Sequence, residues 1–172
     1  MRYKLFGTHT GLRVSELVLG TGNFGTRWGH GTEPDEARRI FETYAEAGGN
    51  FIDTADSYQF GQSEEILGEL LQGRRDDFVV ATKFTQRANP KDGILVTGNS
   101  RKAMTASVEA SLKRLKTDHI DLYWVHYSDG VMPLDVEERM ARESRCDPDL
   151  WLVEVDDRAG RHFLEIARED QG

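Results

Sequence analysis

The stretch that decides the fold is Gly49-Asn50-Phe51-Ile52-Asp53-Thr54-Ala55-Asp56-Ser57-Tyr58. It begins with a short apolar run that predicts a buried strand ending at Asp53, and Tyr58 follows five positions later. Similar runs occupy residues 17–21, 78–83 and 120–126, and the last two end in Lys83 and His126. Active sites of parallel α/β proteins are built at the C-terminal ends of the strands, so these four polar groups are expected to gather there.

Segments with helical periodicity separate the four strands. Thr32 is the expected N-cap of the first helix, and Gly48-Gly49 the expected end. Ser63 is the expected cap of the second helix, which Gly73 stops, and residues 85–99 form a loop. A third helix is predicted from an apolar stripe made by Met104, Val108, Leu112 and Leu115. Strands that alternate with helices predict parallel pairing through right-handed crossovers, and therefore an α/β fold.

The two ends of the chain differ from this pattern. Residues 1–15 predict a hairpin that caps one end of a barrel, with a frayed tail as the alternative. Residues 134–172 carry twelve acidic and six basic residues and do not continue the alternation, although 150–155 and 162–166 are compatible with a second hairpin. We therefore expect a half barrel over residues 1–133 and a divergent acidic tail over 134–172.

Composition limits the function classes. The net charge is −8, which argues against nucleic acid or an anionic membrane as a partner. Neither an apolar run of about 18 residues nor the apolar core of a signal peptide is present, so a cytoplasmic protein is expected. Cys146, His119 and His162 are isolated and are expected to be structural or solvated, and no metal site is predicted.

The four strand-end groups suit reduction of a carbonyl. A phenol ionises near pH 10, and a neighbouring lysine ammonium lowers that pKa, while a carboxylate holds the lysine in place. A histidine can orient or polarise the carbonyl. Since no side chain supplies hydride, a nicotinamide cofactor is implied. Each residue also has a structural alternative: Asp53 capping a turn, Lys83 reaching solvent, Tyr58 packing over the barrel mouth, and His126 as a satisfied strand-end histidine.

Longer motifs show a family resemblance. They are the segments 3–24 and 49–58, together with Gly61-Gln62-Ser63-Glu64-Glu65-Ile66-Leu67-Gly68 and Asp121-Leu122-Tyr123-Trp124-Val125-His126. Residues 1–133 resemble the aldo/keto reductases of the bacterial type, which are akin to potassium-channel β subunits. The resemblance implies a (β/α)8 barrel that uses NADPH to reduce aldehydes or ketones.

The resemblance also implies residue roles. Tyr58 would be the general acid, Lys83 would lower its pKa, Asp53 would hold Lys83, and His126 would orient the carbonyl. Thr21, Gly22 and Asn23, together with Asp53, would lie against the cofactor. Arg27 and Trp28, in the same loop, would touch the substrate.

The resemblance covers only part of such a barrel, which needs about 250 residues. In the family, later strands bind the rest of the cofactor, and nothing in 134–172 matches their motifs. The fold predicted is thus a partial TIM (β/α)8 barrel of about four parallel strands. We expect a truncated or short NADP(H)-dependent oxidoreductase acting on a small carbonyl substrate, with a homodimer as one way to cover the open edges. The alternatives are a non-catalytic half-barrel binding or regulatory module that has lost cofactor binding, and a gene product without a stable role.

Overall fold

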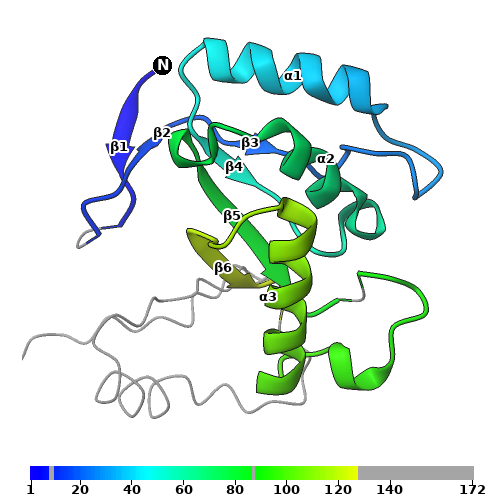
Figure 1. Cartoon of the computed structure of the whole chain (residues 1–172). Helices are drawn as coiled ribbons and strands as arrows, with labels where there is room; N and C mark the ends of the chain where they lie inside the picture. Colours follow the sequence, from blue (N-terminus) through cyan, green and yellow to red (C-terminus); the bar gives the residue numbers. More distant parts are fainter. Residues whose placement is uncertain (8–9, 87, 128–172) are drawn as a thin grey trace, which may run out of the picture.

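The computed structural model of the chain describes residues 1–7, 10–86 and 88–127, and the predicted tail at 134–172 lies outside them (Figure 1). An antiparallel hairpin pairs β1 (Tyr3–Leu5) with β2 (Arg13–Ser15). A second sheet has four parallel strands in sequential order, namely β3 (Leu19–Gly20), β4 (Phe51–Asp53), β5 (Val79–Phe84) and β6 (Leu122–Val125). The α/β partial barrel and its N-terminal hairpin are confirmed.

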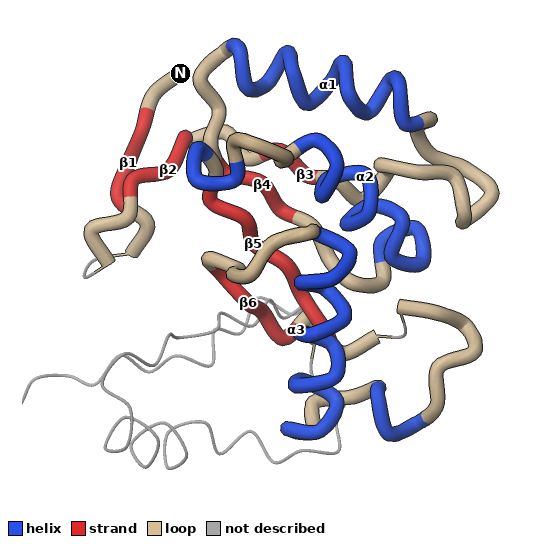
Figure 2. The backbone as a smooth tube through the Cα atoms, viewed as in Figure 1, coloured by secondary structure: helices blue, strands red, loops and turns tan. Residues whose placement is uncertain are grey.

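Helices alternate with the strands of the parallel sheet (Figure 2). They are α1 (Pro34–Glu46), α2 (Gln62–Leu70) and α3 (Arg101–Leu115), with the short 3-10 turns η1 (Tyr58–Gly61), η2 (Arg75–Asp77) and η3 (Ile94–Val96). A core cluster joins all three helices to one face of the sheet, through Phe41 of α1, Leu67 of α2, Leu115 of α3 and the strand residues Ile52 and Val80. This face is the outer, helix-covered face of the partial barrel.

The other face of the sheet carries the complementary residues, because successive side chains of a strand point in opposite directions. Phe51, Val79 and Ala81 cluster there with Val14 of β2 and with Phe6, which packs edge-on against Phe51. The hairpin predicted to cap one end of the barrel therefore packs against part of the inner face. Asp53 and Lys83 lie two positions beyond Phe51 and Ala81, so the strand geometry sends both side chains to this inner face.

Two predicted helix caps are wrong. Helix α1 has Glu33 rather than Thr32 at its N-cap. The backbone of Thr32 instead hydrogen-bonds to Asn23 and Gly25, and Pro34, whose fixed φ suits a first helical position, begins the helix. Helix α2 has Gly61, at φ +84°, at its N-cap rather than Ser63. The Ser63 hydroxyl is buried in a tertiary contact described below.

The predicted apolar stripe of α3 is wrong at three of its four positions, since only Leu115 is buried. Met104 is exposed, and Val108 and Leu112 are only half-buried. The buried face lies one position earlier and is made by Ala103, Ser107 and Ser111, with Leu115 at the end. Small side chains fit there because the helix layer is closely packed: a Cβ on Gly68 of α2 would lie 2.4 Å from the carbonyl oxygen of Arg114.

The strands are close to their predicted positions but differ in length. The first strand is reduced to Leu19–Gly20, since Leu17 and Val18 are exposed. Residues 123–125 of β6 are half-buried rather than covered on both faces, and β6 is an edge of the described sheet. Within the described residues, no helix combines the length and apolar character that crossing a membrane requires.

Candidate active site

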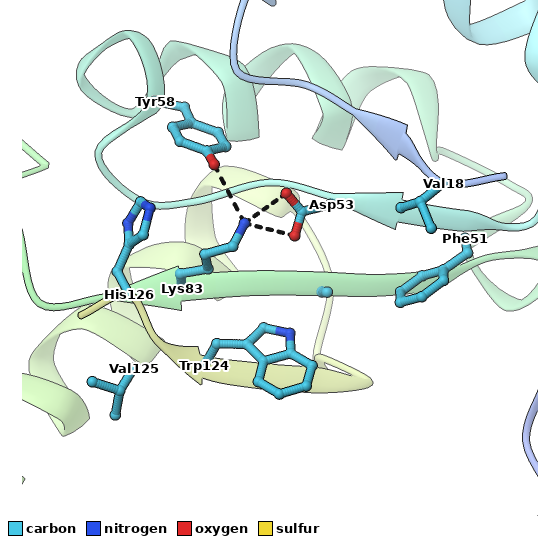
Figure 3. Close-up of a pocket in the computed structure, with 9 residues that line it drawn as sticks. Val18, Phe51, Asp53, Tyr58, Lys83, Trp124, Val125 and His126 are labelled. Carbon is cyan, nitrogen blue, oxygen red and sulfur yellow. Dashed lines mark hydrogen bonds and ion pairs between the residues drawn. The ribbon is translucent and has the colours of Figure 1, made fainter. Parts of the chain in front are cut away.

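The Lys83 ammonium is the centre of the site on the inner face (Figure 3). Its Nζ lies 2.6 Å from both carboxylate oxygens of Asp53 and donates to the carbonyl oxygen of Thr54 at 2.8 Å. It also lies 3.4 Å from the hydroxyl oxygen of Tyr58. The carboxylate and the carbonyl fix the amine, which presents its positive charge to the phenol oxygen.

Tyr58 reaches this position through a tight turn after β4. The backbone N–H of Asp56 donates to the carbonyl of Lys83, and the N–H of Tyr58 donates to the carbonyl of Ala55. The phenol thus stands at the start of η1, directly above the strand end that carries Asp53. Its ring meets that of His126 edge-on, with centroids 5.7 Å apart.

His126 follows β6 directly, and its backbone N–H donates to the carbonyl of Phe84. Burial and the nearby Lys83 charge hold the pKa of its imidazole below the usual value of 6.5, with Asp53 acting in the opposite sense. Nδ1 is buried and has no hydrogen-bond partner among the described residues. The ring is therefore mostly neutral at pH 7.

The structure thus brings together all four strand-end residues predicted from the sequence. They line a cavity of about 420 Å³ whose other walls are Val18, Phe51, Ala81, Trp124 and Val125. The structural alternatives for these residues are less well supported. Lys83 is mostly buried and points to Asp53 rather than to solvent, and Tyr58 is oriented by Lys83 and His126.

The predicted cofactor residues occupy three different environments. Gly22 lies beside the phenol: a Cβ at this position would be 3.8 Å from the Tyr58 ring, an ordinary van der Waals contact. Asn23 is exposed. Thr21 is fully buried, and both its N–H and its hydroxyl donate to the carbonyl of Asp53, at 2.9 and 3.1 Å. Thr21 therefore supports the strand end beneath the site.

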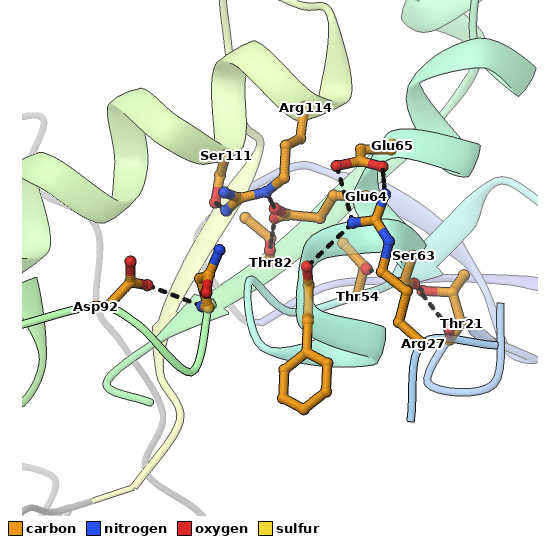
Figure 4. A network of polar contacts seen from close by, with 12 residues as sticks. Thr21, Arg27, Thr54, Ser63, Glu64, Glu65, Thr82, Asp92, Ser111 and Arg114 are labelled. Carbon is orange, nitrogen blue, oxygen red and sulfur yellow. Dashed lines mark hydrogen bonds and ion pairs between the residues drawn. The ribbon is translucent and has the colours of Figure 1, made fainter. Parts of the chain in front are cut away.

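Two residues that support the site, Ser63 and Thr54, were not predicted from the sequence (Figure 4). The Ser63 hydroxyl lies 2.7 Å from the carbonyl oxygen of Thr21 and 3.2 Å from the hydroxyl of Thr54, which ties α2 to the ends of β3 and β4. The Thr54 carbonyl accepts from Lys83. No local sequence pattern indicates either role, since Ser63 has the pattern of a helix cap and Thr54 that of a turn residue.

Two further acidic residues, Glu64 and Asp56, are buried in the described part of the structure. Glu64 is fully buried, accepts from the Thr82 hydroxyl at 2.6 Å and pairs with Arg114 at 2.7 Å. Asp56 is buried as well, and its Oδ1 has no partner among the described residues. Burial, reinforced by the charge of Glu64 and opposed by that of Arg114, raises the pKa of Asp56 from 3.8 to about 7.

The two residues of the 22–31 loop that were predicted to touch the substrate, Arg27 and Trp28, have different partners in the structure. Arg27 forms an ion pair with Glu65 and donates to the carbonyl of Phe60. The ring of Trp28 instead meets Tyr58 edge-on at 6.3 Å. Of the two, only Trp28 lies next to the phenol. In the described ranges no three acidic, histidine or cysteine side chains gather as metal ligands.

Comparison with known proteins agrees with the family resemblance of the sequence. Residues 16–156 match the family model described as the aldo/keto reductase family, a range that runs past residue 133 into the predicted tail. The chain is 41% identical over 147 residues to norsolorinic acid reductase of Aspergillus flavus, covering 80% of this chain and 37% of that protein. It is 40% identical over 141 residues to the NADP(+) aryl-alcohol dehydrogenase of Phanerodontia chrysosporium, covering 74% and 37%.

A solved structure gives the corresponding result for the fold. The holo form of the aldo-keto reductase AKR11C1 from Bacillus halodurans has 34% sequence identity and a TM-score of 0.68, and the match covers 84% of this chain and 47% of that one. The chain therefore spans a little over a third of the two curated relatives and about half of this solved structure.

Proposed function

The chain belongs to the aldo/keto reductase family, and we propose that its site reduces an aldehyde or ketone with NADP(H). One observation carries this proposal: a single ammonium, that of Lys83, bridges the Asp53 carboxylate at 2.6 Å and the Tyr58 hydroxyl at 3.4 Å. An anchored positive charge beside a phenol is the arrangement needed to make a phenol give up its proton.

Tyr58 would donate its proton to the carbonyl oxygen of the substrate. Negative charge develops on the phenol oxygen as the proton leaves, and the Lys83 ammonium stabilises it. Asp53 holds the ammonium in place. The phenolate then recovers a proton from solvent, so the side chains end the reaction as they began it.

His126 would orient the substrate. Its mostly neutral ring lies edge-on to Tyr58 and lines the same cavity. A hydrogen bond from this ring to the carbonyl oxygen would hold that oxygen within reach of the phenol.

We propose that Gly22, Asn23 and Asp53 lie against the nicotinamide end of the cofactor, since Gly22 has no side chain beside the phenol ring and Asn23 is exposed next to it. Thr21, which is fully buried, would support this site through its hydrogen bonds to the Asp53 carbonyl. When bound, the reduced nicotinamide would supply the hydride, which no side chain can provide. Hydride on carbon and the Tyr58 proton on oxygen together convert the carbonyl into an alcohol.

Aromatic carbonyl compounds are the first substrates to try. The rings of Trp28 and His126 both face Tyr58, and Trp124 lines the cavity, so a flat aryl group would find apolar surfaces on several sides. The printed names of two relatives, norsolorinic acid reductase and aryl-alcohol dehydrogenase, support the same choice.

The test uses NADPH binding and turnover with an activated aryl aldehyde. We expect quenching of NADPH fluorescence on binding, and measurable oxidation that Tyr58→Phe lowers by about 10²- to 10⁴-fold, the usual contribution of a general acid. Tyr3→Phe, at an exposed tyrosine outside the site, is the matched control and should keep the wild-type rate. Equal rates for wild type and Tyr58→Phe would remove Tyr58 from the chemistry. A wild type that does not bind NADPH would favour the non-catalytic binding module instead.

A further inference from the structure

A buried side chain makes hydrogen bonds to the backbone of the loop that carries Trp28. Gln59 is fully buried, directly after Tyr58 in the sequence. Its Oε1 accepts from the backbone N–H of Trp28 at 2.9 Å, and its Nε2 donates to the carbonyl of His30 at 3.1 Å. Both bonds go to the backbone of the 22–31 loop, so they fix the path of the chain on either side of Trp28.

The backbone at Gln59 is strained. Gln59 and Phe60 have φ values of +52° and +53°, a left-handed conformation that is unfavourable for a residue other than glycine. Two such residues in succession persist only where surrounding contacts impose them. The strained turn directs the Gln59 side chain into the loop.

The loop is shaped to receive this side chain. Gly31 has φ +129°, and a Cβ there would lie 2.9 Å from Nε2 of Gln59 and 2.0 Å from the carbonyl oxygen of Gly25. The next contact along the loop comes from Gln62, whose Oε1 accepts from the N–H groups of Thr26 and Arg27. The loop is thus tied to η1 and the start of α2 along its length.

The turn that sets Gln59 also sets Tyr58. The Trp28 ring lies edge-on to Tyr58 at 84° and to Phe60 at 83°, each with centroids 6.3 Å apart. We infer that Gln59 is a positioning residue, which holds Trp28 beside the Tyr58 phenol as a preformed wall for the aryl group of the substrate. This inference rests on the proposed function, because it assigns the wall to a carbonyl substrate.

The first experiment does not need turnover. Trypsin cleaves after Arg27, and the Arg27–Trp28 bond lies between the loop contacts of Gln59 and Gln62. Gln59→Gly removes the side chain and accepts the positive φ, whereas Gln59→Glu keeps the size and the acceptor but loses the donor to the His30 carbonyl. We expect cleavage at Arg27 to be about fivefold faster or more in Gln59→Glu, which loses one hydrogen bond, and at least about tenfold faster in Gln59→Gly, which loses two, since a lost hydrogen bond of about 1 kcal/mol corresponds to a factor of about five.

The controls are a matched glutamine and a reference bond. Gln72→Ala changes an exposed glutamine and should cleave at the wild-type rate. Cleavage at Arg101, the first residue of α3, should be equal in all four proteins, which shows that the variants stay folded. Wild-type cleavage at Arg27 in both Gln59 variants would overturn the inference.

The second experiment measures KM and kcat for a large and a small carbonyl. Only a substrate with a bulky group, such as the ring of benzaldehyde, would reach Trp28. Gln59→Gly should therefore raise KM for benzaldehyde by about tenfold or more and change KM for acetaldehyde little. Faster cleavage with an unchanged KM for benzaldehyde would show that the contact is structural and overturn the inference. If the wild type has no turnover, the proposed function fails, and cleavage at Arg27 alone decides whether Gln59 holds the loop.

Discussion

We predict that Asp56→Asn stabilises the folded chain in a pH-dependent way. Asp56 is buried near the Glu64–Arg114 pair, and its Oδ1 has no hydrogen-bond partner among the described residues. Burial raises its pKa from 3.8 to about 7, so the folded chain keeps a proton on this carboxyl that the unfolded chain has released. Stability therefore falls as the pH rises from about 4 to about 8, and the loss is complete above about pH 8.

The size of the effect follows from the same pKa. One pKa unit corresponds to about 1.4 kcal/mol, so ionising Asp56 costs the folded chain about 4 kcal/mol at neutral or higher pH. Asparagine has nearly the same shape and no charge to bury. The gain in unfolding free energy of the variant over the wild type should grow by about this amount between pH 4 and about pH 8 and stay constant above it.

Urea unfolding followed by far-ultraviolet circular dichroism, at a series of pH values, measures this difference directly. Asp76→Asn, at an exposed aspartate of η2, is the matched control and should show no such rise. A gain that changes by less than about 1 kcal/mol between pH 4 and pH 7 would refute the argument that Asp56 ionises without compensation.

Three further predictions concern other parts of the molecule. Lys83→Met should raise the pKa of His126, since a nearby positive charge is lost, and an NMR titration of the imidazole checks this; unchanged midpoints would contradict it. Arg114→Met leaves the buried Glu64 carboxylate unpaired and should lower the unfolding free energy by about 3–5 kcal/mol, against at most about 1 kcal/mol for Glu69→Gln at an exposed ion pair. We also expect copies of the chain to associate, because β3 and β6 are the edges of the described sheet; sedimentation at micromolar concentration would show dimers, and a sharp monomer would argue against it.

Three of the four groups of the site were predictable because they follow from strand geometry, whereas Tyr58 reaches the site through the turn after β4. Asp53, Lys83 and His126 stand at the ends of apolar runs, and parallel strands place such ends at one edge of a sheet. Alternation then sends Asp53 and Lys83 to the same face, since they are two positions beyond the inner-face residues Phe51 and Ala81. The structure brings these side chains together at hydrogen-bonding distance, as this argument requires.

The supporting residues were not predictable, because their partners are distant in the sequence. Ser63 has the local pattern of a helix cap, yet its hydroxyl contacts Thr21, which lies 42 positions earlier. The role of Gln59 depends on a left-handed backbone that its residue type disfavours. The face of α3 was misassigned because small residues such as Ala103 and Ser107 do not stand out in a hydrophobic pattern, although close packing favours them.

The most direct test of the account is transfer of label from NADPH to the product. The central claim is that the site of Asp53, Tyr58, Lys83 and His126 joins hydride and proton on one carbonyl. NADPH deuterated at C4, prepared separately with the label on each face, is incubated with benzaldehyde, and the alcohol is examined by mass spectrometry. The account predicts that deuterium reaches the carbinol carbon from one face only, and that Tyr58→Phe slows its appearance by about 10²-fold or more. Alcohol without deuterium from either face, or equal labelling rates in wild type and Tyr58→Phe, would contradict it.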